Sequence, residues 1–186
     1  MTNENKKPIV VNLFGPPGSG KSTGAAYIFS KLKMAGINAE LVDEFAKGKV
    51  WEENKEAFNN QVYMLGKQYF KMSRCADKVD VIVTDSPLLL SILYNKNSEV
   101  LGQPFNDLVA NVFNSYNNKN YLINRVKPYN PKGRLQTEEE SNDLRQPLIN
   151  IMNDYNVNFI EYDGVEDDYN KIIEEIISLV RDKNND

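Results

Sequence analysis

The sequence predicts a three-layer α/β domain built on a five-stranded parallel sheet. Short apolar runs rich in β-branched residues alternate five times with helical patterns along the 186 residues. No linker or repeat interrupts this alternation, so residues 1–186 are expected to form one domain. A glycine-rich motif follows the first run. With right-handed crossovers, this placement favours the strand order 2-3-1-4-5.

The motif GPPGSGKS over residues 15–22 fits G-x-x-x-x-G-K-[ST] at every fixed position. An apolar strand is expected before it at 8–14, and a helix after it ends at Gly36. This context indicates a P-loop that binds the phosphates of ATP, with Lys21 on the β- and γ-phosphates and Ser22 on Mg²⁺. The expected cradle consists of Gly15, Pro16, Pro17, Gly18, Ser19, Gly20, Lys21, Ser22 and Thr23.

Composition narrows the chemistry further. The chain has one cysteine and no histidine, which excludes an internal disulfide, a cysteine-cluster metal site and a histidine base. The net charge of −4 argues against a general nucleic-acid-binding surface. No apolar run approaches membrane-spanning length, and the polar start at 1–7 has no apolar signal core after it. We therefore expect a cytoplasmic protein without a membrane partner.

A second strand, 38–42, is expected to end at Asp43 and Glu44. The carboxyl edge of an open α/β sheet is where ligands bind, although acids at a helix N-terminus would fit equally well. The next segment, 53–76, has the pattern of one amphipathic helix. Its expected core stripe is Phe58, Val62, Leu65, Tyr69 and Met72. Gln61 and Gln68 lie beside the stripe and could enter a cleft, although we expect them to face water, and Trp51 is either packed or stacked on a base.

A third strand, 79–83, leads to Asp85, whose carboxylate is expected to face Mg²⁺ and the phosphates. Alternatively, Asp85 caps a helix that begins at Ser86-Pro87. A further helix is expected over 105–116 and a short fourth strand over 121–123, separated by Asn117 and Asn118. The inner face of that helix is predicted to carry Leu108, Val109, Val112 and Phe113.

The segment at about 125–136 is polar and contains four cations, two prolines and a glycine. Basic charge beside a phosphate site indicates a lid that closes on ATP, although a solvated basic loop would have the same composition. Thr137 then begins a capping box with Glu140, and Pro147 predicts a kink or a restart in the helix that follows. A fifth strand at 157–162, a helix at 166–181 and a frayed tail at 182–186 complete the chain.

These motifs resemble those of the small P-loop kinases of nucleosides and nucleotides, in particular the kinase domain that phosphorylates nicotinamide riboside and related AAA-like proteins common in bacteriophage genomes. The resemblance covers nearly the whole chain and rests on the P-loop, 43–47, 84–87 and the lid through Arg134. It implies a P-loop NTPase fold and a Mg-ATP-dependent phosphotransferase. The acceptor would be a hydroxyl or phosphate of a nucleoside- or nucleotide-type molecule. A guanine-reading N-K-x-D motif is absent, because the sequence at 118–121 is NKNY.

The resemblance also implies residue roles. Glu44 or Asp85 would orient or deprotonate the acceptor, Ser22 and Asp85 would hold the metal, and Lys21 would act on the phosphates. The lid residues Arg125 and Arg134 would neutralise the charge of the transferring group.

Residues 85–87 read Asp-Ser-Pro where deoxynucleoside kinases have a Glu-Arg-Ser type signature, so the acceptor stays open. Two alternatives remain. One is a kinase of 5-hydroxymethyluracil in phage DNA, which would work in the host cytoplasm, and the other is a P-loop ATPase switch acting on a protein partner. The sequence makes no prediction of oligomeric state.

Overall fold

The computed structural model describes residues 7–95 and 99–185, so the polar start at 1–6 lies outside the described residues. The strands are β1 (Ile9–Phe14), β2 (Ala39–Val42), β3 (Val81–Thr84), β4 (Asn117–Asn124) and β5 (Ile160–Asp163). They form one parallel sheet in the order β2-β3-β1-β4-β5, which confirms the predicted fold class and strand order. Every residue of β1 is buried, as expected for the central strand.

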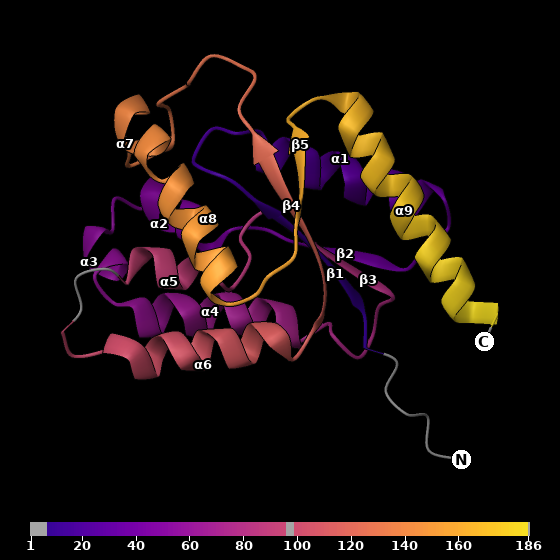
Figure 1. The fold of residues 1–186 in the computed structure, drawn as a ribbon, viewed down its shortest axis with the longest axis horizontal. Helices are drawn as coiled ribbons and strands as arrows, with labels where there is room; N and C mark the ends of the chain where they lie inside the picture. Colours follow the sequence, from indigo (N-terminus) through magenta and orange to yellow (C-terminus); the bar gives the residue numbers. More distant parts are fainter. Residues whose placement is uncertain (1–6, 96–98, 186) are drawn as a thin grey trace.

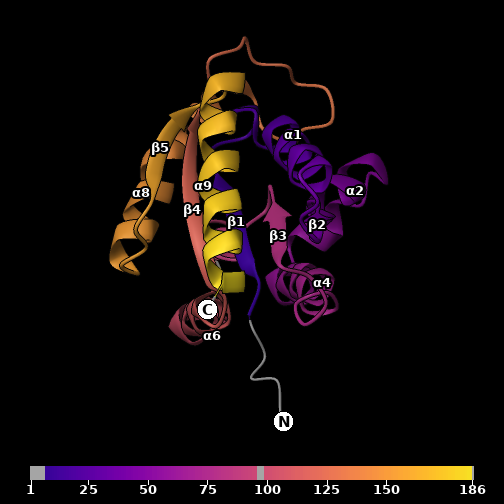
Figure 2. The same ribbon diagram turned by 90° about the vertical axis from the view of Figure 1, so that its right-hand side faces the viewer.

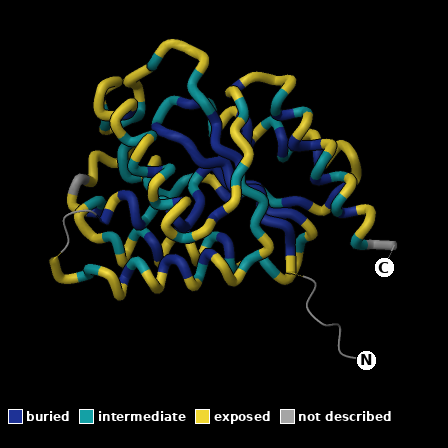
Figure 3. The backbone as a smooth tube through the Cα atoms, in the orientation of Figure 1, coloured by how far each residue is buried: buried dark blue, intermediate teal, exposed yellow. Residues whose placement is uncertain are grey.

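Helices cover both faces of the sheet (Figures 1 and 2). They are α1 (Lys21–Met34), α2 (Phe45–Trp51), α3 (Lys55–Phe58), α4 (Gln61–Ser73), α5 (Leu90–Tyr94), α6 (Gly102–Asn114), α7 (Glu138–Asp143), α8 (Arg145–Asp154) and α9 (Glu166–Asn185). Helices α1 and α9 pack on one face around Val11 and Leu13, and α4, α5, α6 and α8 pack on the other around Val10 and Phe14. Figure 3 shows the buried strands between these exposed outer layers.

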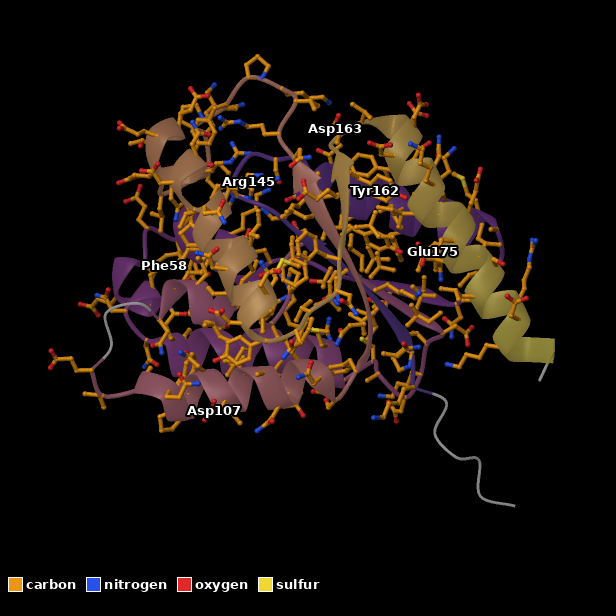
Figure 4. The ribbon with its side chains drawn as sticks, in the orientation of Figure 1. Phe58, Asp107, Arg145, Tyr162, Asp163 and Glu175 are labelled. Carbon is orange, nitrogen blue, oxygen red and sulfur yellow. The ribbon has the colours of Figure 1, made fainter. Side chains whose placement is uncertain are left out.

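Side-chain hydrogen bonds tie the helices to the sheet edges. In Figure 4, Arg145 of α8 lies beside the end of the β4 strand, where its guanidinium donates to Asn124 (3.1 Å) and to Glu161 (2.8 Å). On the other face, the Glu175 carboxylate of α9 accepts hydrogen bonds from Lys119 and Tyr121 of β4. These contacts fix β4, whose carboxyl end leads into the lid.

An amide cluster joins β1 to β4 inside the sheet. Asn12 is fully buried, and its Nδ2 donates to Asn118 Oδ1 (2.8 Å) and to Asn120 Oδ1 (3.1 Å). Asn118 in turn donates to the Phe113 carbonyl at the end of α6. We predicted that Asn117 and Asn118 end the preceding helix, but α6 ends at Asn114 and both residues belong to β4, where the Asn118 side chain is paired with Asn12 and the Phe113 carbonyl.

The prediction of a single helix over 53–76 is wrong, because this segment forms the two helices α3 and α4. Asn54 and Asn60 each accept a hydrogen bond from a backbone N–H three residues later, so each starts a new helix, α3 and α4. The predicted stripe changes as a result: Val62 and Tyr69 are exposed, whereas Gln68 is buried together with Leu65 and Met72.

Other boundaries also differ. Helix α5 begins at Leu90 and its N-cap makes no side-chain hydrogen bond, so Asp85 caps no helix and Ser86-Pro87 does not start one. Leu108 is exposed rather than on the inner face of α6. Helix α9 continues through the predicted frayed tail as far as Asn185, the last described residue.

The second half contains two confirmed predictions. The capping box of Thr137 and Glu140 is present, and the helix restarts as α8 at Arg145, which places Pro147 in the first turn. Among the described residues, no helix is long and apolar enough to cross a membrane.

Candidate active site

A cavity of about 570 Å³ opens at the carboxyl ends of β1, β2 and β3. Its walls are the P-loop, the start of α2, the residues after β3, and the lid. The lid connects β4 to α7 and arches over this edge of the sheet (Figures 1 and 2). This is the edge at which open parallel sheets bind ligands.

The P-loop backbone requires glycine at two positions in particular. Gly15 and Gly20 have φ values of 143° and 105°. A Cβ on Gly15 would lie 2.7 Å from the Ile123 carbonyl oxygen, and a Cβ on Gly20 would lie 2.8 Å from the Tyr169 hydroxyl. The loop therefore passes closer to β4 and α9 than any other residue type would allow, and it delivers the open N-terminus of α1 to the cavity.

Lys21 is the first residue of α1 and lines the cavity. Its Nζ donates to the carbonyls of Gly15 (2.7 Å) and Pro16 (3.0 Å), which holds the ammonium group against the loop. Burial lowers the pKa of Lys21, and the nearby carboxylates of Glu44 and Asp85 oppose this shift. The cavity thus places a desolvated cation between the phosphate loop and two acids.

The acidic pair after β2 is divided between two environments. Asp43 turns outward and pairs with Lys71 of α4 at 2.5 Å, whereas Glu44 lines the cavity. Burial raises the pKa of Glu44, Lys21 lowers it, and Asp85 raises it further. A carboxylate whose pKa is raised is a better proton acceptor than an ordinary glutamate, as a general base requires.

Asp85 lies directly after β3 and lines the same cavity as Ser22. Only 5% of Asp85 is exposed, and its Oδ1 is buried without a hydrogen-bond partner among the described residues. The Ser19 hydroxyl is similarly buried and unpaired. An unpaired buried oxygen is costly, so the Asp85 carboxylate, which lines the cavity, points to a polar ligand there, whereas Ser19 does not line the cavity.

The two predicted lid arginines lie in different places. Arg134 lines the cavity and its guanidinium stacks on Tyr129, 5.4 Å from the ring centroid. Arg125 is not among the cavity-lining residues; it donates to Glu138 (3.0 Å) and Asn142 (2.6 Å) of α7 and also stacks on Tyr129. Arg125 therefore fastens the base of the lid.

A further bond anchors the lid end of α7 to the phosphate loop, where the buried Ser141 hydroxyl donates to the Pro17 carbonyl at 2.7 Å. Lys127 and Lys132, which the sequence showed only as part of the basic segment, also line the cavity.

Beyond the two acids, the cavity is lined by a wall of apolar and amide side chains from α2, α3, α4 and α5. This wall consists of Phe45, Phe58, Gln61, Met64, Gln68, Leu90, Ser91 and Tyr94. Gln68 is 6% exposed and accepts a hydrogen bond from the Phe45 N–H at 3.0 Å, so our expectation that it faces water is wrong. Sequence reasoning found none of these residues as site residues, because they converge only through the packing of four helices.

A second cavity of about 300 Å³ shares Ser22, Glu44, Lys47 and Asp85 with the first. Its outer wall includes Trp51 at the end of α2.

The residues present fit a magnesium nucleotide. The P-loop supplies inward amides and Lys21, and the unpaired Asp85 oxygen and the Ser22 hydroxyl line one cavity. Among the described residues, no group of three His, Cys, Asp or Glu side chains could hold a metal. Mg²⁺ is commonly bound through one or two protein oxygens together with substrate phosphates, and Ser22 and Asp85 could supply the protein oxygens.

A family model described as an AAA domain matches residues 10–167 of the chain. The chain belongs to this family. The match begins in β1 and ends in the first turn of α9, so the AAA domain includes the P-loop, both acids and the lid. A search of curated proteins found no match.

Solved structures share the fold of this AAA domain. A NadR protein in complex with NR has a TM-score of 0.67 and 17% identity, over 91% of this chain and 50% of its own. A NadR protein in complex with NAD and AMP-PNP has a TM-score of 0.61 and 17% identity, over 90% of this chain and 48% of its own. Thymidylate kinase from Ehrlichia chaffeensis has a TM-score of 0.59 and 12% identity, over 94% and 99%. The chain thus spans about half the length of the NadR chains and has the fold of P-loop kinases.

Proposed function

We propose that this protein is a Mg-ATP-dependent phosphotransferase whose acceptor is a hydroxyl of a nucleoside- or nucleotide-type molecule. The observation that carries the proposal is the convergence of Lys21, Glu44, Asp85 and Arg134 on one cavity that also has an apolar and amide wall. The similar folds support it, since one is titled a thymidylate kinase and another contains the ATP analogue AMP-PNP. Residues 125–136 act as the lid.

In this proposal, bound Mg-ATP supplies the phosphoryl group and a metal charge that offsets the charge of the phosphates. Within residues 15–23, the backbone N–H groups of the non-proline residues would hold the phosphates, and the Lys21 ammonium would neutralise the transferring group. Ser22 and Asp85 would hold the metal. Their shared cavity and the unpaired Asp85 oxygen support this assignment.

Glu44 is proposed as the general base and Asp85 as the metal ligand. The raised pKa of Glu44 makes it the more basic carboxylate for taking the acceptor proton, and a cavity wall for an acceptor begins at the next residue, Phe45. Arg134 would stabilise the charge on the transferring group. Arg125 would contribute indirectly, because its bonds to α7 fix the base of the lid.

The wall beyond Glu44 is suited to a flat, neutral ring system. Phe45, Phe58 and Tyr94 offer aromatic surface, and Gln61 offers an amide. The cations of the cavity lie on the P-loop, on the lid and at Lys47, whereas the side chains that the structure describes on α3, α4 and α5 contribute none to its lining. For these reasons a hydroxyl acceptor attached to a heterocyclic ring is favoured over a free phosphate acceptor.

Transfer from γ-labelled ATP to a panel of acceptors tests the proposal. The panel contains free nucleosides, nucleotides, nicotinamide riboside, and DNA with and without 5-hydroxymethyluracil. Label on a small molecule supports the proposal and names the acceptor. Label on modified DNA alone would favour the DNA kinase, for which the exposed Lys127 and Lys132 at the cavity give some support. Phosphate released only to water, with stimulation by a protein, would overturn the kinase in favour of an ATPase switch.

A further inference from the structure

The single tryptophan of the chain contacts the tip of the lid. Trp51 is the last residue of α2, and Gly133 lies in the lid with a φ of 72°. A Cβ on Gly133 would lie 2.7 Å from Cζ2 of the indole and 3.1 Å from Cη2. The indole edge therefore packs directly on the Gly133 backbone, at a distance that no side chain at this position would permit.

This contact adjoins the charged residue of the lid that faces the phosphates. Gly133 precedes Arg134, which lines the cavity and whose charge acts on both Lys21 and Glu44. Tyr129, which also belongs to the lid, packs against the P-loop, since a Cβ on Gly18 would lie 3.0 Å from its ring. The lid segment that carries Arg134 is thus supported by Tyr129 at the P-loop and by Trp51 at α2.

Core packing does not account for the position of Trp51. Its exposed fraction is 67%, and it belongs to neither core cluster of the described residues. Large aromatic side chains stabilise a fold mainly through burial, so an indole this exposed adds little to overall stability. The ring contact with Gly133 is the interaction that the structure gives it with the lid.

We infer that Trp51 is a positioning residue, which holds the lid tip at Gly133 so that Arg134 stays over the P-loop. Helix α2 then links two parts of the site: it starts directly after Glu44 and ends at the lid contact. The inference rests on the proposed phosphotransferase function for its effect on rate, while the contact itself is independent of that function.

Two glycine variants isolate the ring contact. Gly133→Ala and Gly36→Ala introduce similar backbone strain, because the φ values are 72° and 80°. A Cβ on Gly36 meets no atom within 4 Å, whereas the one on Gly133 meets the indole. Since Trp51 is the only tryptophan, its fluorescence reports this contact directly. Gly133→Ala should shift the emission to longer wavelength and weaken binding of AMP-PNP with Mg²⁺, and Gly36→Ala should leave both unchanged.

Variants of Trp51 test the effect on rate. Trp51→Ala should lower kcat by about 10- to 100-fold, the range expected when a charge-stabilising group is displaced by about 1 Å, with a smaller change in KM for ATP. Trp51→Phe keeps an aromatic ring and should restore most of kcat. Phe70→Ala is the matched control, because Phe70 is 64% exposed on α4 and does not line the cavity.

The outcomes separate the two proposals. If no acceptor is phosphorylated, the proposed function fails, and the emission and AMP-PNP binding of Gly133→Ala still decide the lid contact. An unchanged emission maximum and unchanged AMP-PNP affinity in Gly133→Ala would overturn the inference. So would a Trp51→Ala enzyme with wild-type kcat, or one that loses kcat only in proportion to a loss of folded protein.

Discussion

Replacing Asp85 by asparagine is expected to change activity and stability in opposite directions. Only 5% of Asp85 is exposed, and its Oδ1 has no hydrogen-bond partner among the described residues. A buried polar atom left in this state destabilises a fold by about 1–3 kcal/mol. Asparagine has nearly the same shape but no charge, so the larger cost of burying an unpaired carboxylate is removed and only the smaller cost of an unpaired amide remains.

The substitution also removes the attraction between Asp85 and Lys21, and this loss offsets part of the gain in stability. We therefore expect Asp85→Asn to raise the free energy of unfolding by about 1 kcal/mol, the lower end of that range. For a chain of this size the corresponding rise in Tm is about 2–4 °C. Differential scanning fluorimetry without added ligand measures it.

The same substitution should lower the phosphotransfer rate by about 10²- to 10³-fold, as removal of one preorganised charge-stabilising contact does. It should also raise the Mg²⁺ concentration needed for half-maximal rate. Asp80→Asn is the matched control, because Asp80 is an exposed acid at the opposite end of β3. A fall in Tm of several degrees for Asp85→Asn, or an unchanged Mg²⁺ requirement, would refute the reasoning and make Asp85 a structural residue.

Three further predictions concern the P-loop and the base. Lys21→Ala should abolish phosphotransfer while Tm stays close to wild type, and a normal transfer rate would contradict the P-loop assignment. The rate of the wild type should fall as the pH drops through the raised pKa of Glu44, because the protonated acid cannot accept a proton. The acidic limb of the pH–rate profile should therefore lie above the usual range for glutamate. Glu44→Gln should be about 10²- to 10⁴-fold slower and lose this limb in a pH–rate profile; a limb that persists would assign it to another group. Tyr169→Phe removes the 3.1 Å bond to the Gly20 carbonyl and should lower the free energy of unfolding by about 0.5–1 kcal/mol in urea titrations, because that carbonyl still accepts from the Gly24 N–H. No loss of stability would mean that the hydroxyl contributes nothing to the P-loop anchor.

The fold could be predicted from the sequence because its signals are local. The apolar runs, the spacing of the P-loop and the capping box of Thr137 each depend on a few adjacent residues, and all three predictions hold. The prediction of one helix over 53–76 was wrong because it followed the apolar spacing alone. A continuous apolar period spans Asn54 and Asn60, but the side chains of these residues bond to the backbone and interrupt the helix.

The charged half of the site was also visible in the sequence, since Glu44 and Asp85 follow strands that end at one sheet edge. The apolar half was not. Gln68 lies 24 residues after Glu44, and its amide reaches the cavity by accepting from the Phe45 N–H and donating to the Asp43 carbonyl. Arg125 and Arg134 look alike in sequence, and only the acceptors on α7 distinguish the residue at the lid base from the one in the cavity.

The amide cluster in the sheet also bears on how the chain reaches this structure. Side chains alternate between the faces of a strand, so a slip of β4 by one residue would turn Asn118 and Asn120 away from Asn12. The Asn12 Nδ2 group would then lose both of its acceptors on β4 at a fully buried position. The aliphatic residues of β1 tolerate several pairings, whereas the asparagines accept one. The cluster therefore disfavours a sheet misaligned by one residue, and the register that it stabilises sets where the P-loop and the lid lie at the ends of these two strands.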